Sequence, residues 1–281
     1  MSLARLPRRL LPRRLLLLLR HCRAHSSTHH PQPSPEPSST LHESVTRLDG
    51  LKSARPFSAF LTDRFARRHT YLRISITERC NLRCTYCMPA EGVQLSPAAH
   101  LLTTPEIVEL ASAFVAEGVT KIRLTGGEPT VRRDLVELVD ALGALRESGL
   151  RELAMTSNGV ALPPRRLDRL VAAGLTGLNL SLDTLVPAKF QFVTRRQGLD
   201  RVLAVVDHAT ARLGFGAPPA AADQPPRTLK VNVVAMRGVN DDELCDFVAL
   251  TQDLPLEVRF IEYMPFDVRC LLPFVLGQAS S

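Results

Sequence analysis

An eleven-residue segment, RCNLRCTYCMP (Arg79–Pro89), places three thiols close together in the chain: Cys80, Cys84 and Cys87. Thiolates are ligands of zinc and of iron–sulfur clusters. A structural zinc site takes four ligands, usually as two separated pairs, but the next thiol is Cys245 and the nearest histidines lack ligand-like spacing. A cubane cluster normally takes four thiolates, so three leave one iron open to another ligand. The spacing therefore favours an iron–sulfur cluster with an open coordination site over zinc.

Six apolar runs of strand type must position this segment, and they alternate mainly with helical patterns. The runs are Tyr71–Thr77, Lys121–Thr125, Glu152–Thr156, Leu178–Asp183, Leu229–Met236 and Glu257–Met264. The alternation predicts an α/β fold with parallel strands and right-handed crossovers, either doubly wound or curled into an incomplete barrel. In both arrangements the carboxyl ends of the strands share one edge, where ligands bind. Polar residues follow these ends at Thr77 and Glu78, Gly126 to Glu128, Thr156 to Asn158, Asp183, and Glu262 to Met264.

Helix boundaries are marked by capping residues. The Thr104–Pro105 pair predicts a helix with a threonine cap and proline in its first turn. DLVELVDALGALRESG predicts a helix that ends at Gly149, and Asn240 followed by two acids predicts another cap. Cys245 lies within this last amphipathic helix, so we expect it to be a buried structural thiol.

The cysteine loop, with aromatic Tyr86 before its last cysteine, resembles that of the radical S-adenosylmethionine superfamily. TGGEP, which follows the second strand run, resembles the cofactor-binding glycine motif of the same superfamily. The resemblance implies an incomplete (β/α)6 TIM-like barrel, a 4Fe–4S cluster on the three cysteines, and S-adenosylmethionine bound to the open iron. We expect the glycines to let the backbone approach the ligand, with Glu128 or backbone carbonyls accepting from an ammonium group.

A longer set of motifs resembles the mitochondrial GTP 3',8-cyclases of molybdenum cofactor synthesis. The motifs, in chain order, are RISITERCNLRCTYCMP, IRLTGGEPTVR, TSNG, LNLSLDTL, KVNVVAMRGVNDDEL and VRFIEYMPF. The resemblance implies that GTP loses its 3' hydrogen to an adenosyl radical and is converted to (8S)-3',8-cyclo-7,8-dihydroguanosine 5'-triphosphate. It also implies an electron donor and a downstream partner, cyclic pyranopterin monophosphate synthase, and it is compatible with a homodimer.

The same resemblance assigns roles to residues at matching positions. The implied cluster ligands are Cys80, Cys84 and Cys87; the implied cofactor contacts are Tyr86, Gly127, Ser181 and Met264. The implied GTP contacts are Arg73, Arg123, Thr156 and Lys230. Two arginines and a lysine suit a triphosphate, since arginine binds phosphate as a fork and lysine as a point charge. No side chain is assigned as a catalytic acid or base.

The match to this family ends at Asp267, and VRCLLPFVLGQASS beyond it contains only Cys270. The family continues with three more cysteines that bind a second cluster, so we expect a chain truncated near the sixth strand. We expect that strand to lack a covering helix and to expose apolar surface. An alternative to the GTP cyclase is therefore a catalytically incomplete form that binds one cluster and S-adenosylmethionine.

Charge is distributed unevenly along the chain. The first 70 residues hold 13 Lys/Arg against 4 Asp/Glu, and the remaining 211 hold 22 against 24, so nucleic-acid binding is not expected. Met1–Arg23 has seven arginines and no acid, which favours a mitochondrial transit peptide; a secretory signal is the alternative, but Leu15–Leu19 is too short an apolar run. We expect a transit peptide over 1–28, a disordered linker over 29–56, a partial barrel over 57–267 and a divergent tail over 268–281. The expected location is the mitochondrial matrix, and no membrane span is expected.

Overall fold

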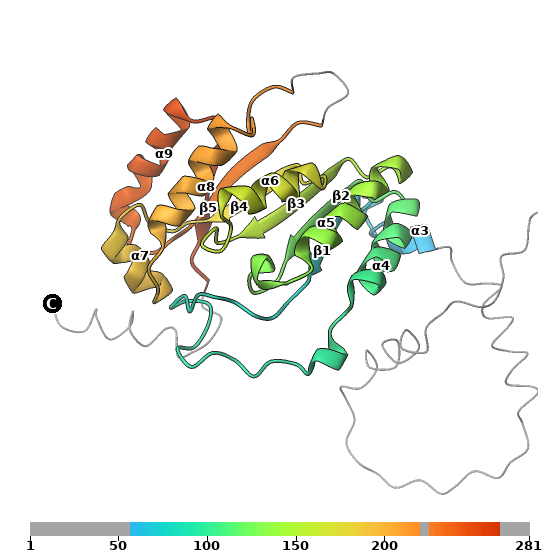
Figure 1. Cartoon of the computed structure of the whole chain (residues 1–281), viewed down its shortest axis with the longest axis horizontal. Coiled ribbons are helices and arrows are strands. Elements are labelled where there is room, and N and C mark those ends of the chain that lie inside the picture. Colours follow the sequence, from blue (N-terminus) through green and yellow to red (C-terminus); the bar gives the residue numbers. More distant parts are fainter. Residues whose placement is uncertain (1–56, 220–224, 265–281) are drawn as a thin grey trace, which may run out of the picture. The chain divides into compact units, whose positions relative to one another are not determined.

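The computed structural model of the chain describes residues 57–219 and 225–264 (Figure 1). Its six strands are β1 (Tyr71–Ser75), β2 (Lys121–Thr125), β3 (Glu152–Ser157), β4 (Gly177–Ser181), β5 (Thr228–Ala235) and β6 (Glu257–Glu262). They form one parallel sheet in which each strand pairs with the next in the sequence. A doubly wound sheet would reverse its strand order, and in the described residues β1 and β6 form no ladder with each other. The predicted incomplete barrel is thereby confirmed. The predicted transit peptide and linker, and the tail, lie outside the described residues.

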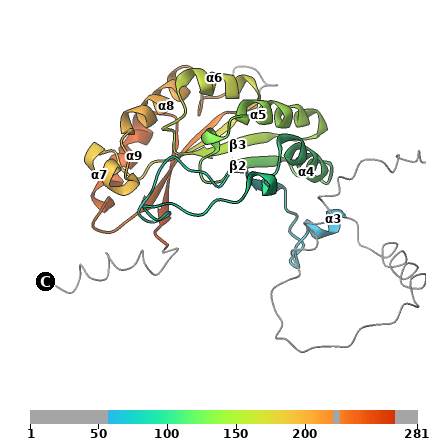
Figure 2. The ribbon, with the colours of Figure 1, turned by 60° about the horizontal axis from the view of Figure 1, so that its bottom comes forward.

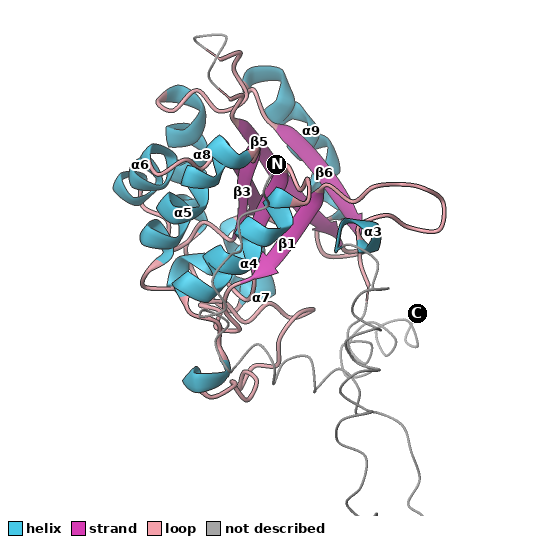
Figure 3. Cartoon of the chain, turned by 90° about the vertical axis from the view of Figure 1, so that its right-hand side faces the viewer, coloured by secondary structure: helices cyan, strands magenta, loops and turns pink. Residues whose placement is uncertain are grey.

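Helices connect the strands and lie along one side of the sheet (Figure 2). They are α4 (Thr104–Ala116), α5 (Leu135–Gly143), α6 (Pro164–Ala172), α7 (Pro187–Thr194), α8 (Leu199–Ala211) and α9 (Leu244–Asp253), and α3 (Phe57–Phe60) precedes the sheet. Short 3-10 helices are η1 (Ala98–His100), η2 (Pro129–Val131), η3 (Ala144–Ser148) and η4 (Asp241–Glu243). Figure 3 shows the same layering from another side. None of the described helices has the length and apolarity that crossing a membrane requires.

The two faces of the sheet differ in chemistry. In β2 to β5, every second residue, such as Ile122 and Leu124 of β2, is buried against the helices, whereas the corresponding residues of β1 and β6 are not fully buried. The alternate residues form what we call the polar face, which on β2 carries Lys121, Arg123 and Thr125. Side chains of a strand alternate between faces, so period-two sequences such as KIRLT produce this division directly. The apolar face packs against the helices and holds the fold together, whereas the polar face is not packed against them.

Strand β6 is an edge strand with apolar side chains in contact with solvent. Phe260 and Ile261 are 42% and 39% exposed. The ring of Phe260 contacts Phe247 of α9 edge-on, with centroids 6.4 Å apart, so α9 covers part of this strand. The expected exposure of apolar side chains on β6 is confirmed, although these side chains are only partly exposed.

Helix α4 begins one residue earlier than the sequence predicted. Its cap is Thr103, whose backbone N–H and hydroxyl both donate to the Glu106 carboxylate at 2.8 Å. The Thr104 hydroxyl instead donates to the Asp134 carboxylate. Both threonines can cap, and the glutamate three residues after Thr103 completes a capping box, which decides between them.

Three further predictions about helices need correction. The helix expected to end at Gly149 ends at Gly143 and continues as η3, and Gly149 then adopts a left-handed φ of 112°. Asn240 precedes η4, but its side chain bonds other loops and caps nothing. Cys245 is exposed, because the inward position of this turn of α9 is taken by Phe247.

Candidate functional site

The three cysteines lie on one long loop that leaves the carboxyl end of β1 and leads to η1. Cys80 and Cys84 are half-buried, Cys87 is exposed, and none of them is in a disulfide. The backbone N–H groups of Cys87 and Met88 both donate to the Cys84 carbonyl at 3.0 Å, which folds the second half of the motif into a turn. The Leu82 backbone N–H donates to the Cys80 sulfur at 3.4 Å. All three thiols therefore lie on one short segment at the ligand-binding end of the sheet.

Burial controls the ionisation of two of these thiols. It raises the pKa of Cys84 to about 12 and also raises the pKa of Cys80. Both thiols stay protonated at neutral pH until a metal ion displaces the proton. Among the residues that the structure describes, no three His, Cys, Asp or Glu side chains converge as a metal-binding group. The three donors fit an iron–sulfur cluster in their chemistry, and their sulfurs must turn toward one another to share it.

Two arginines hold the backbone of the cysteine loop. Arg83 Nη1 donates to the carbonyls of Cys80 and Leu82 at 2.9 and 2.7 Å. Arg195 Nη1 donates to the carbonyls of Arg83 and Met88 at 3.3 and 3.4 Å. The guanidinium groups thus span the segment that carries all three cysteines, and they place positive charge beside it.

The end of helix α7 anchors the middle of the same loop. The carbonyls of Val193 and Thr194 accept from the backbone N–H groups of Thr85 and Arg83 at 2.9 and 3.1 Å. The last carbonyls of a helix have no partner within the helix, so they are available to such a loop. No local sequence signal marks these carbonyls of α7, because the contact joins segments more than one hundred residues apart.

The two glycines of TGGEP allow two loops to touch. A Cβ at Gly126 would lie 2.3 Å from the Thr77 carbonyl oxygen, and one at Gly127 would lie 2.4 Å from that of Arg79. The Gly127 N–H donates to the Thr77 carbonyl at 2.7 Å, and the Glu128 N–H donates to the Arg79 carbonyl at 2.8 Å. These glycines admit the backbone at the start of the cysteine loop, and the expectation that they also let a ligand approach stays a prediction.

Glu128 is a structural carboxylate. It is 1% exposed, and its Oε1 accepts from the Thr130 N–H, the Thr130 hydroxyl and the Ser157 hydroxyl at 3.0, 2.6 and 2.8 Å. Its Oε2 accepts from the Asn158 N–H at 2.7 Å. These bonds tie the TGGEP loop to the TSNG loop after β3. The expectation that Glu128 accepts from a ligand ammonium group is corrected, and the backbone carbonyls remain the candidates for that bond.

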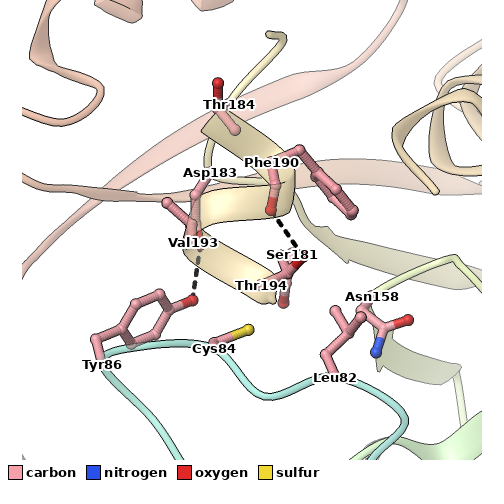
Figure 4. Close-up of a pocket in the computed structure, with 10 residues that line it drawn as sticks. All are labelled: Leu82, Cys84, Tyr86, Asn158, Ser181, Asp183, Thr184, Phe190, Val193 and Thr194. Atoms are coloured by element: carbon pink, nitrogen blue, oxygen red, sulfur yellow. Dashed lines mark hydrogen bonds between the residues drawn. The ribbon is translucent and has the colours of Figure 1, made fainter. Parts of the chain in front are cut away.

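Tyr86 joins the cysteine loop to the ends of β4 and β5. Its hydroxyl donates to Asp183 Oδ2 at 2.8 Å (Figure 4). Asp183 Oδ1 accepts from the Val234 N–H at 2.9 Å, and Asn240 Nδ2 donates to the Asp183 carbonyl at 2.6 Å. Burial raises the pKa values of both Tyr86 and Asp183. This explains why Asn240 is buried rather than capping: it closes a network between three loops.

A pocket opens between the cysteine loop and the end of β4, and Figure 4 shows the side chains that line it. Three residues assigned by resemblance, Cys84, Tyr86 and Ser181, share its wall. Asn158 also lines it and is held by a 2.7 Å bond from its Nδ2 to Asn81 of the cysteine loop. The pocket is therefore next to the loop that carries the three cysteines.

The other two predicted cofactor contacts, Gly127 and Met264, are not among the residues that line this pocket. Gly127 is exposed, as is Met264, whose exposed fraction is 58%. Tyr263, next to Met264, packs its ring edge-on to that of Tyr86 with centroids 6.5 Å apart. The end of β6 therefore reaches the cysteine loop. The roles of these residues remain predictions.

The four predicted GTP contacts all lie on the polar face. Arg73 pairs in register with Arg123. Thr156 pairs with Asn179, which pairs in turn with Lys230. The two guanidinium groups lie 5.9 and 5.3 Å from the Tyr71 ring centroid, and the ammonium group of Lys230 bonds Glu257 at 2.7 Å. The strands thus place the predicted residues on one surface, and their contact with GTP remains a prediction.

Other polar-face residues were not singled out from the sequence. They include Lys121, paired with Glu152 at 2.6 Å, and Arg259, paired with Glu257. Asn179 is 1% exposed and its side-chain amide has no partner among the described residues. The period-two pattern of each strand marks all three as lying on the same face, and that signal was available in the sequence.

Comparison with protein families and with curated proteins gives related sequences. A model described as the radical SAM superfamily matches residues 74–251. Molybdenum cofactor biosynthesis protein 1 of Mus musculus is 56% identical over 239 residues, which are 84% of this chain and 35% of that protein. The mitochondrial GTP 3',8-cyclase of Arabidopsis thaliana is 54% identical over 81% of this chain and 56% of its own length. The GTP 3',8-cyclase of Geobacter sulfurreducens is 48% identical over 73% and 58%. The chain therefore spans 35% to 58% of the length of these relatives.

Solved structures give the same fold at low sequence identity. Streptococcus suis SuiB bound to S-adenosylmethionine superposes with a TM-score of 0.51 at 18% identity, covering 94% of this chain and 56% of that one. HydG, a maturase of the [FeFe]-hydrogenase, superposes with a TM-score of 0.52 at 14% identity, covering 69% and 43%. These likenesses concern the arrangement of strands and helices.

Proposed function

The chain belongs to the radical S-adenosylmethionine superfamily, and on this premise we propose that it is a GTP 3',8-cyclase. The reaction would convert GTP to (8S)-3',8-cyclo-7,8-dihydroguanosine 5'-triphosphate in the first step of molybdenum cofactor biosynthesis. Two relatives that are 54% and 48% identical carry the name of this enzyme. Because the chain spans only part of their length, the activity of the whole protein is part of the proposal.

One observation carries the proposal. The three-cysteine loop and the TGGEP loop bond to each other at the carboxyl ends of the strands, beside a sheet face that bears Arg73, Arg123 and Lys230. A cofactor site and an anion-binding surface at one end of a barrel are what chemistry on a nucleoside triphosphate needs.

We assign the cofactor to the cysteine-loop end of this surface. Cys80, Cys84 and Cys87 would hold a 4Fe–4S cluster, and Tyr86, Gly127, Ser181 and Met264 would contact S-adenosylmethionine. When bound, the reduced cluster and this cofactor would together supply a carbon radical able to take a hydrogen atom from the substrate. Arg83 and Arg195 keep the thiol segment folded, and Tyr86 fixes it to Asp183, so the chain itself sets where the radical would be generated.

We assign the substrate to the polar face. Arg73, Arg123, Thr156 and Lys230 would bind GTP, with the cationic groups on the phosphates. The ribose must then point toward the cofactor, because only a hydrogen atom within close reach can be transferred. The mechanism needs no acid or base from the chain for hydrogen transfer, and positioning is the contribution of these residues.

The proposal extends to location and partners. The arginine-rich first residues and the mitochondrial name of the Arabidopsis relative support a mitochondrial protein, in the matrix. An electron donor must reduce the cluster, and cyclic pyranopterin monophosphate synthase would consume the product. A homodimer is a further proposal.

Anaerobic reconstitution tests the activity. The full chain, loaded with iron and sulfide, is mixed with S-adenosylmethionine, a reductant and GTP, and the 3',8-cyclised nucleotide is sought by mass spectrometry. We expect product from the wild type and none from Cys84→Ser. Cleavage of S-adenosylmethionine without cyclised GTP would contradict a cyclase while leaving membership of the superfamily intact.

A further inference from the structure

Buried polar atoms without a hydrogen-bond partner are concentrated on the polar face. In the described part of the chain there are four such side-chain atoms: Arg123 Nε, Asn179 Nδ2, Asn179 Oδ1 and Thr228 Oγ1. Their residues belong to β2, β4 and β5, at positions that alternate with the helix-packed leucines and valines. Native proteins satisfy nearly all buried polar groups, because each unpaired one is costly. A group of such atoms on a surface proposed to bind substrate therefore indicates a ligand.

Asn179 is the centre of this group. Its side chain lies in register between Thr156 and Lys230, which are both proposed GTP contacts. Thr228 precedes Lys230 by two residues, so it lies on the same face, diagonally next to Asn179. The strand backbone fixes all these positions, and no loop has to move to bring them together.

The chemistry of these atoms indicates an anion. Three of the four are donor nitrogens or a hydroxyl that can donate, and Asn179 Oδ1 can accept from the ammonium group of Lys230, which has three donors. The face around them carries five cations and two acids: Arg73, Lys121, Arg123, Lys230 and Arg259 against Glu152 and Glu257. A phosphoryl group, with its several acceptor oxygens and negative charge, is the part of a nucleoside triphosphate that matches this set.

Access to Asn179 requires a neighbouring side chain to move. Its exposed fraction is 1%, so a ligand reaches its amide only after a flexible neighbour turns aside. Lys230 is the long side chain beside it, and its ammonium group bonds Glu257 at 2.7 Å in the ligand-free chain. A phosphate offers Lys230 a more highly charged partner than one carboxylate does.

We propose that Asn179 and Thr228 are further substrate-binding residues, and that the Asn179 amide and the Thr228 hydroxyl donate hydrogen bonds to a phosphate of the bound nucleoside triphosphate. The identity of the nucleotide in this inference rests on the proposed function. The choice of a phosphate as ligand is independent of the proposed function, because it follows from the donors and cations of the polar face.

Calorimetric titration of the full chain tests the proposal with two probes, GTP and inorganic triphosphate. Asn179→Asp places a carboxylate against the phosphate, and we expect it to lower the affinity for both probes at least about tenfold. Thr228→Val has the same shape without the hydroxyl, and we expect both probes to weaken about fivefold, as loss of one hydrogen bond would. Gln252→Glu adds the same charge on an exposed position of α9 and should leave both affinities unchanged.

Thermal unfolding separates a binding role from a structural one. If Thr228 Oγ1 is unpaired until substrate binds, Thr228→Val should melt at the wild-type temperature or higher while binding phosphate more weakly. A variant that melts lower and binds normally would show a structural hydroxyl and would overturn the proposal for Thr228. Thr228→Val also keeps the test open if Asn179→Asp does not fold.

The two probes distinguish the possible failures. If Asn179→Asp and Thr228→Val bind both probes with wild-type affinity, the inference is overturned. It is also overturned if these variants bind GTP more weakly but bind inorganic triphosphate normally, because the two residues would then contact the nucleoside. If the wild type binds inorganic triphosphate but not GTP, and the variants lose it, the phosphate contact stands and the cyclase proposal fails. Binding of neither probe to the wild type would overturn both.

Discussion

Glu128 accepts four hydrogen bonds from three residues, two from backbone N–H groups and two from hydroxyls. Such donors replace the water that a buried carboxylate loses, and the positive charge of Arg166 also acts on Glu128. Thr130 lies on the TGGEP side and Ser157 and Asn158 on the TSNG side, so the carboxylate joins two loops that must keep a fixed distance. Its position in a ligand-binding motif therefore reflects the assembly of the site.

Glu257 allows a prediction about pH. Hydrogen bonds from Arg259 and then from Lys230 lower its pKa from 4.5 to about 2. Because the folded pKa is below the unfolded one, the interaction stabilises the fold fully above pH 4.5, and this contribution is lost as pH falls from about 4.5 toward 2. The carboxylate is half exposed, so we expect less than about 1 kcal/mol.

An NMR titration of the Glu257 carboxyl measures this pKa directly. Lys230→Met removes one of the two cationic donors, and the Glu257 pKa should then rise toward 4.5. A wild-type value already at 4.5 would show that the two contacts are not formed in solution.

The loop before β1 contains a strained element. Ala66 has a left-handed φ of 61°, in a turn closed by the antiparallel bridge between Thr62 and Arg68. This conformation costs an L-residue about 1–2 kcal/mol, and glycine adopts it freely at an entropic cost of about 0.5–1 kcal/mol. Ala66→Gly should therefore stabilise the fold by about 0.5–1 kcal/mol, measured by chemical denaturation.

The same substitution elsewhere supplies the control. Ala113 is exposed in the last turn of α4, where the backbone is helical and Ala113→Gly should destabilise by about 0.5–1 kcal/mol. Destabilisation of the same size at both positions would mean that Ala66 is not held in the left-handed conformation.

Helices and strands could be predicted from the sequence wherever a local residue pattern determines where they form. The strands agree to within two residues at each end because alternating apolar residues define both the strand and its buried face. Prediction from the sequence failed at Thr104, Asn240 and Cys245. The capping box with Glu106 selects Thr103 instead of Thr104, Phe247 takes the inward position instead of Cys245, and a distant contact with Asp183 decides the role of Asn240. Propensity gave Asn240 as a cap, but its amide forms stronger tertiary bonds within the loops after β4 and β5.

Some residues of the candidate site could be predicted from the sequence and others could not. The cysteine motif and the residues assigned by resemblance were found because their spacing is recognisable in the sequence, and the structure brings Cys84, Tyr86 and Ser181 to one pocket. The supporting bonds from Arg195 and from the end of α7 were not predicted, since they depend on how the loop folds against a helix far along the chain. Asn179 was not singled out because the period-two pattern shows which face it lies on but not that its buried amide lacks a partner among the described residues.

At the scale of the whole molecule, the number of iron atoms bound per chain tests the proposed cluster. Anaerobic reconstitution should yield about four irons per chain, as expected for one cubane, and Cys84→Ser should lose them. Iron and zinc are measured by elemental analysis. Cys245→Ser is the matched control, because Cys245 is exposed on α9, and it should keep its iron. Zinc without iron, or loss of iron in Cys245→Ser, would exclude a cluster held by the three-cysteine loop.

The division of the sheet into an apolar and a polar face also guards against misfolding. If β2 paired with β1 or β3 in a register shifted by one residue, Lys121 and Arg123 would be buried in the apolar layer under the helices. Ile122 and Leu124 would then face the solvent. Slipped pairings are thus rejected by the very cations that would hold the nucleotide. Evolution toward a different ligand on this surface must therefore keep enough hydrophilic side chains in place for the strands to find their proper alignment.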